Sequence, residues 1–130
     1  MERLDPRVLE RISGPAWDGI RDSFLQVSSV LLSVAPEAAS ELTTIYVKYK
    51  LQSDAVAPVY AVAWIKSSKQ FTVGLSLPDD FDDEALGRAP QGTSYKGLTK
   101  YFTVRAGEGC PSQLSTWARA AYEGARNQCK

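Results

Sequence analysis

The clearest hydrophobic pattern in the chain lies in two neighbouring runs, residues 60–65 and 70–77. Apolar residues occupy every second position of the later run: Phe71, Val73, Leu75 and Leu77. This period of two predicts a strand with one face in the core and the other facing solvent. In the earlier run both alternating sets are apolar, so we expect it inside the sheet, with Tyr60, Val62 and Trp64 on one face. The polar residues 66–69 lack an Asn-Gly or Asp-Gly pair, which favours a connecting loop of about three to five residues.

Apolar residues recur at helical spacing near both ends of the chain. Between residues 15 and 34 they follow three- and four-residue steps: Trp17, Ile20, Phe24, Val27, Leu31 and Val34. A second such stripe follows the turn at 107–111: Leu114, Trp117, Ala118, Ala121 and Ala125. Both patterns predict amphipathic helices that need an apolar partner. A short helix is expected at about 5–12, because Asp5 suits the N-cap and Pro6 the first helical position.

Weaker patterns complete the predicted fold. Residues 45–50 and 98–105 alternate as strands do, with Leu98 expected on the same face as Phe102 and Val104. Residues 36–44 are compatible with one turn of helix, and residues 79–87 with a short helix that has an acidic first turn. We therefore predict one α+β domain spanning residues 1–130, with its core at about 15–128. Its antiparallel sheet would have about four strands, with the N-terminal and C-terminal helices packed on one face.

Composition excludes several kinds of chemistry. The 15 basic and 15 acidic residues cancel, so a charged surface would have to be local. No apolar run reaches the length of about 20 residues that spans a bilayer, and the first residues lack a signal-peptide layout, so we expect a cytoplasmic protein without a membrane partner. The chain has no histidine, the commonest general base and metal ligand. We therefore expect no enzyme activity, no catalytic residues and no cofactor. Cys110 and Cys129 would lie on the order of 25 Å apart along the last helix and are expected to be free thiols.

Four stretches together resemble a known family. They are Tyr46-Val-Lys-Tyr-Lys50, Phe71-Thr-Val-Gly-Leu-Ser-Leu-Pro78, the strand near 98–105, and Ala120-Ala-Tyr-Glu123 in the last helix. Over about residues 20–127 the chain resembles a small bacterial domain of unknown function, often labelled "predicted transport protein" and sometimes attached to nuclease-like domains. The resemblance implies an α+β domain with helices packed on an antiparallel sheet, and it supplies no catalytic residues. Where the family often has Gly-His or Gly-Trp, this chain has residues 93–97 without histidine, so a role that depends on that histidine would not carry over.

Basic residues and tyrosines alternate through the predicted strands and turns. Outside the acidic run 79–84, residues 45–105 contain eight basic residues against Asp54 alone. The candidate binding residues are Tyr46, Lys48, Lys50, Lys66, Lys69, Lys96, Lys100 and Tyr101. A basic surface with aromatic rings can bind phosphates by charge and bases by stacking, so the partner would be a nucleic acid, an acidic protein or a small anionic ligand. Lysine and tyrosine are also ordinary residues on the solvent face and exposed edges of a sheet.

Two further groups of residues are candidate sites. The acidic run at 79–84 has the oxygen ligands that Ca²⁺ or Mg²⁺ prefers but lacks EF-hand spacing, so we assign no metal ligand. A metal-dependent enzyme that uses this run is nevertheless the alternative function, together with a homo-oligomeric structural protein. Trp17, Trp64 and Trp117 could line a cofactor pocket, but we expect all three in the core between the helices and the sheet.

Overall fold

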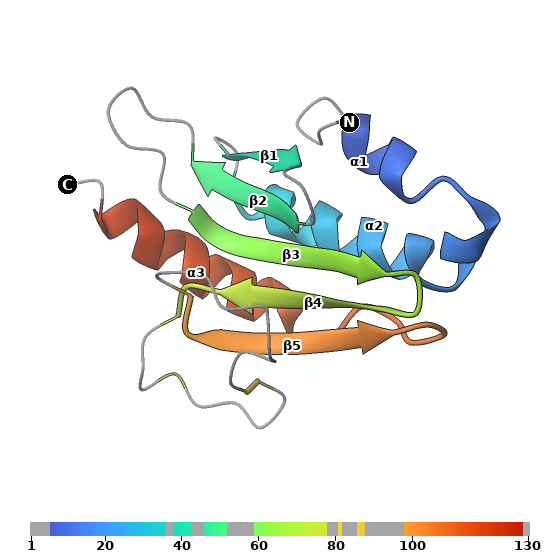
Figure 1. Cartoon of the computed structure of the whole chain (residues 1–130). Helices are drawn as coiled ribbons and strands as arrows, with labels where there is room; N and C mark the ends of the chain where they lie inside the picture. The colour runs from blue at the N-terminus through green and yellow to red at the C-terminus, as the bar shows by residue number, and fades with distance from the viewer. Residues whose placement is uncertain are drawn as a thin grey trace.

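Five antiparallel strands form one sheet in the computed structural model, in the order of the chain, β1-β2-β3-β4-β5 (Figure 1). The structure describes residues 6–35, 38–42, 46–51, 59–77, 81, 86–87 and 98–128. The helices are α1 (Pro6–Arg11), the 3₁₀ turn η1 (Pro15–Trp17), α2 (Asp18–Ser33) and α3 (Leu114–Gln128). The strands are β1 (Ala38–Leu42), β2 (Tyr46–Leu51), β3 (Val59–Ser67), β4 (Gln70–Leu75) and β5 (Lys100–Arg105). The predicted α+β class is confirmed, with five strands where about four were expected.

Both long helices cover the same face of the sheet (Figure 1). The predicted stripe of α3 is wholly buried, and in α2 the central members of the stripe are buried while Trp17 and Val34 at its ends are half-buried. These helix residues meet alternate residues of β2 to β5: Val47, Tyr49, Ala61, Ala63, Ile65, Phe71, Val73, Leu75, Phe102 and Val104. Burial of this apolar surface is the main favourable contribution to folding.

The strand that was not expected from the sequence is β1. It occupies part of the segment in which a turn of helix was expected. It pairs with β2 from Ala38 opposite Leu51 to Leu42 opposite Val47. Its sequence, Ala-Ala-Ser-Glu-Leu, shows no clear alternation and few residues that favour strands. The available edge of β2 supplies its hydrogen bonds, and the Arg7 guanidinium donates to the Leu42 carbonyl. Tertiary pairing therefore decides the conformation of this segment.

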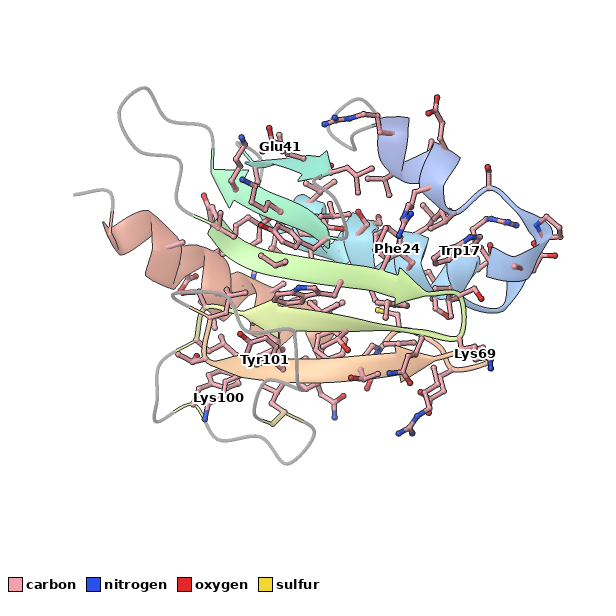
Figure 2. The ribbon with its side chains drawn as sticks, in the orientation of Figure 1. Trp17, Phe24, Glu41, Lys69, Lys100 and Tyr101 are labelled. Atoms are coloured by element: carbon pink, nitrogen blue, oxygen red, sulfur yellow. The ribbon has the colours of Figure 1, made fainter. Side chains whose placement is uncertain are left out.

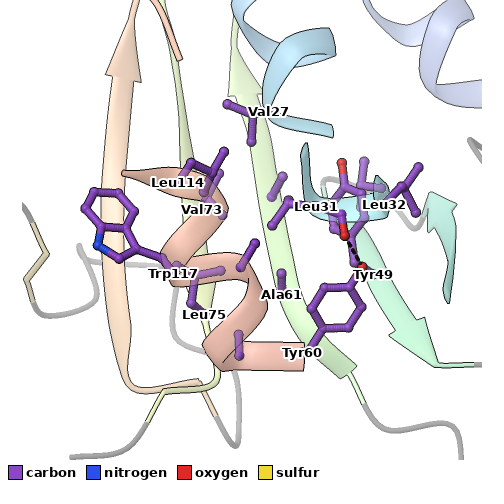
Figure 3. Packing of buried hydrophobic residues seen from close by; sticks show 14 of the residues in the cluster. Val27, Leu31, Leu32, Tyr49, Tyr60, Ala61, Val73, Leu75, Leu114 and Trp117 are labelled. Atoms are coloured by element: carbon purple, nitrogen blue, oxygen red, sulfur yellow. Dashed lines mark hydrogen bonds between the residues drawn. The ribbon is translucent and has the colours of Figure 1, made fainter. Parts of the chain in front are cut away.

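Tyr60 faces the helices, whereas alternation placed it on the opposite face with Val62 and Trp64. The register passes from Tyr49 opposite Ala61 to Lys50 opposite Val59, so Tyr60 is an extra residue in β3. Such a bulge breaks the alternation of side chains. The Tyr60 hydroxyl donates to the Leu31 carbonyl over 2.6 Å in the buried layer shown in Figure 3.

The β3–β4 connection is shorter than expected. Ser67 pairs with Gln70, so only Ser68 and Lys69 form the turn. One extra residue lies in β3 between Trp64 and Ser67, because β4 advances only from Thr72 to Gln70 over the same interval. The irregularity increases the local twist and lets the strands continue to a two-residue turn.

Several sequence predictions concern segments that the structure describes only in part. Only Phe81 of the acidic run 79–84 is described, and Gly87, at the end of the short helix expected there, forms an isolated bridge with Tyr101. Cys110 is a free thiol, while Cys129 lies outside the described residues. Of the helices in the described ranges, none is both long and apolar enough to cross a membrane.

Candidate functional site

The sheet face opposite the helices carries a second apolar cluster, the open-face cluster. It consists of Val62, Trp64, Leu98 and Tyr101, with Tyr46 and Val59 packed against it. The Trp64 ring lies 5.9 Å from the rings of both Tyr46 and Tyr101, measured between centroids. The expectation that Trp64 shares the helix-covered core was therefore wrong. Alternation along β3 places Ala63 and Ile65 toward the helices and Trp64 on the other side.

The open face changes the interpretation of three predicted features. Tyr101, a candidate binding residue, is only 4% exposed and packs within the open-face cluster. The solvent-facing side predicted for β4 is buried at Thr72, whose hydroxyl hydrogen-bonds that of Thr103 over 3.0 Å. Leu98 belongs to the open-face cluster rather than to the face of Phe102 and Val104, because it precedes the first residue of β5.

Three charged residues meet at the β1–β2 side of the open face. Glu41 of β1 lies directly opposite Lys48 of β2, and Lys50 lies two residues further along the same face. The Nζ atoms of Lys48 and Lys50 lie 3.3 and 3.4 Å from the same carboxylate oxygen, Glu41 Oε1. We refer to Lys48 and Lys50 as the lysine pair. Their side chains are 25% and 30% exposed and that of Glu41 is 42% exposed, so solvent reaches the group.

The lysine pair favours the ionised form of Glu41. The hydrogen bond from Lys48, followed by the positive charge of Lys50, lowers the pKa of Glu41 from its ordinary value of 4.5. Glu41, which is ionised at neutral pH in any case, therefore keeps its charge to a lower pH. With two ammonium groups and one carboxylate, these three side chains together carry one net positive charge.

The other candidate lysines lie elsewhere. Lys69 is in the exposed turn at the far end of β3, and Lys100 begins β5 at the opposite edge of the sheet. Figure 2 shows Glu41, Lys69 and Lys100 at three separate places. Lys100 precedes Phe102 by two residues in β5, so alternation places it on the helix-facing side of the sheet, with Phe102 and Val104.

Among the predicted site residues whose side chains are described, the structure places Tyr46, Lys48 and Lys50 together along one strand. Half-buried Tyr46 precedes the lysine pair on the same face of β2. The side chain of Lys66 and the whole of Lys96 lie outside the description.

Glu41 is the member of this site that sequence reasoning missed. It lies in the segment expected to form a turn of helix, and nothing in its local sequence marks it as a partner of Lys48. The contact depends on the register between β1 and β2. The one feature of the sequence that could have suggested the contact is the negative charge of Glu41, which is opposite to the charges of Lys48 and Lys50 in the next strand.

Other surfaces offer less chemistry. Within the described residues, no group of three or more Asp, Glu, Cys or His side chains could hold a metal ion. An open depression of about 660 Å³ runs along α2 and is lined by Asp22, Leu25, Gln26, Ser29, Val30 and Cys110. Burial raises the pKa of the Cys110 thiol, which makes it a poor nucleophile at neutral pH.

Comparisons with protein-family models, with curated proteins and with solved structures found no match to this chain. The resemblance to the small bacterial domain therefore stays an expectation from the sequence.

Proposed function

We propose that the chain is a small cytoplasmic binding module that docks an anionic partner through the lysine pair, with Tyr46 beside it. The observation that carries the proposal is the convergence of both Nζ atoms on one anionic oxygen. Opposite charges at 3.3 and 3.4 Å attract each other, although solvent weakens the attraction because the group is exposed. The pair also keeps one net positive charge after Glu41 is counted, so it attracts a further anion.

This site is narrower than a basic face extending over the whole sheet. Lys69 and Lys100 are too far from the pair to contact the same small group, as Figure 2 indicates. The buried rings of Trp64 and Tyr101 argue against a surface on which successive bases stack. What remains is a local anion site at the β1–β2 side of the open face.

Charge-neutralising substitutions test the proposal. The double variant Lys48→Gln/Lys50→Gln removes the pair, and Lys69→Gln/Lys100→Gln removes the same charge from other places on the sheet. Binding of fluorescein-labelled poly-L-glutamate and of a labelled single-stranded DNA would be followed by fluorescence anisotropy. We expect the first variant to lose binding and the control variant to retain most of it. Affinity should also fall steeply between about 50 and 200 mM salt.

Equal binding by the two double variants would refute the proposed site, because the lysine pair would then contribute no more to affinity than lysines elsewhere on the sheet. Thermal unfolding of each variant checks that the fold is intact. Of residues 79–84 only Phe81 is described, so the alternative of a metal-dependent enzyme, like that of a homo-oligomeric structural role, stays a prediction from the sequence.

A further inference from the structure

Glu41 occupies the position that a partner's anion would take between the two ammonium groups. Its Oε1 atom lies within ion-pair distance of both Lys48 Nζ and Lys50 Nζ. A single side-chain carboxylate therefore fits between the two ammonium groups, with both cations next to the same oxygen atom.

A single point of convergence suits one carboxylate better than a nucleic acid backbone. Nucleic acids present a row of phosphates, and proteins bind them with cations distributed along that row. Lys69 and Lys100 lie apart from the pair and do not continue such a row (Figure 2), and the rings of Trp64 and Tyr101 on the open face are buried. Charge and geometry together favour an acidic peptide segment of a partner protein.

The strand, and not Glu41, places the lysine pair on the open face. Lys48 and Lys50 are two residues apart in β2, so the strand itself places both side chains on the open face. The strand is held by its pairing with both β1 and β3. An ion pair as exposed as that of Glu41 is weak, so another carboxylate can replace it at little cost.

From these relationships we infer that the lysine pair accepts a carboxylate from an acidic peptide segment, and that Glu41 is a built-in competitor which this segment displaces. The inference rests on the proposed function and adds the chemistry of the partner and an autoinhibitory contact. It predicts that removing the carboxylate of Glu41 strengthens binding.

The test compares Glu41→Gln, Glu41→Asp and Glu123→Gln with the wild type, using labelled poly-L-glutamate and labelled single-stranded DNA. Glu41→Gln removes the competing carboxylate, and Glu41→Asp keeps it. Glu123→Gln, at an exposed position of α3, makes the same change in net charge on another part of the surface. We expect Glu41→Gln to bind poly-L-glutamate about fivefold more tightly than the wild type, Glu41→Asp to bind it less tightly than Glu41→Gln does, and Glu123→Gln to bind it within about twofold of the wild type.

The possible outcomes separate this inference from the proposed function. If Lys48→Gln/Lys50→Gln loses poly-L-glutamate but Glu41→Gln binds it no more tightly than the wild type, the competitor role is wrong and the anion site stands. If Glu123→Gln increases the affinity for poly-L-glutamate as much as Glu41→Gln does, the increase comes from the change in net charge, and the competitor role is again wrong. If the lysine pair is needed for DNA and not for poly-L-glutamate, the carboxylate assignment is wrong. If binding of both probes survives Lys48→Gln/Lys50→Gln, the proposed function fails as well.

Discussion

Tyr101 lies directly opposite Gly74 across β4 and β5, and its ring covers the glycine. A Cβ atom added to Gly74 would lie 2.6 Å from Tyr101 Cε2 and 2.9 Å from Leu98 Cδ1. Glycine in a strand interior commonly marks such a close approach. Here it allows the open-face cluster to rest directly on β4, and it explains why a residue that resembled an exposed stacking tyrosine is buried.

Gly74→Ala should therefore destabilise the protein, because the new methyl group forces the Tyr101 ring and Leu98 to move. We expect the free energy of unfolding to fall by about 1–3 kcal/mol, measured by urea denaturation. Gly109→Ala is the matched control, since nothing lies within 4 Å of a Cβ at that position, and it should change stability by less than about 0.5 kcal/mol. Equal stability of the two variants would show that the ring does not pack against the glycine as described.

Tyr49 and Ser28 form a buried hydroxyl pair between β2 and α2. The Tyr49 hydroxyl donates to Ser28 Oγ over 3.0 Å, and burial raises the pKa of Tyr49, so the phenol stays neutral. Tyr49→Phe should lower the free energy of unfolding by about 1–2 kcal/mol, because it leaves a buried serine hydroxyl without this partner. In the double variant Tyr49→Phe/Ser28→Ala the loss should be smaller than the sum of the two single losses, as urea denaturation would measure. Strict additivity would mean that the two hydroxyls do not interact.

The lowered pKa of Glu41 links the lysine pair to the pH dependence of stability. A carboxyl group whose pKa is lower in the folded state stabilises the protein above its unfolded-state pKa, near 4.5, and this stabilisation is lost as pH falls through the folded-state pKa. The wild type should therefore exceed Glu41→Gln in stability at neutral pH, and the difference should vanish in acid. Urea midpoints measured from neutral pH down to about pH 3 would show this. Because the group is exposed, the difference should also shrink as salt is added. A difference that persists unchanged in acid would contradict the assigned ion pair.

The sequence predicted the parts of the fold that depend on local periodicity. The alternation from Phe71 to Leu77 and the helical stripes ending at Val34 and Ala125 identified the buried faces of β4, α2 and α3. The position of Tyr60 was not predictable in this way, because one extra residue in β3 reverses the alternation at that point. Nor was β1, since its residues have weak strand preference and adopt the strand through pairing with β2.

The candidate site was predictable only in part, for a related reason. The alternation of Tyr46, Lys48 and Lys50 places the three residues on one face without knowledge of the tertiary structure. The separation of Lys69 and Lys100 from them follows from strand order and turn position, which a single sequence does not specify. Their neighbour Glu41 depends on strand register, and the burial of Tyr101 depends on its contacts with Gly74 and Leu98.

The central claim is that the lysine pair is where an acidic partner docks, and NMR tests it most directly. Backbone amide chemical shifts of the wild-type protein would be followed while unlabelled poly-L-glutamate is added. We predict saturable changes that are largest at Glu41, Lys48 and Lys50 and that are absent in Lys48→Gln/Lys50→Gln. Changes that are largest at the Lys69 turn or at Lys100, or that persist in the double variant, would contradict the claim.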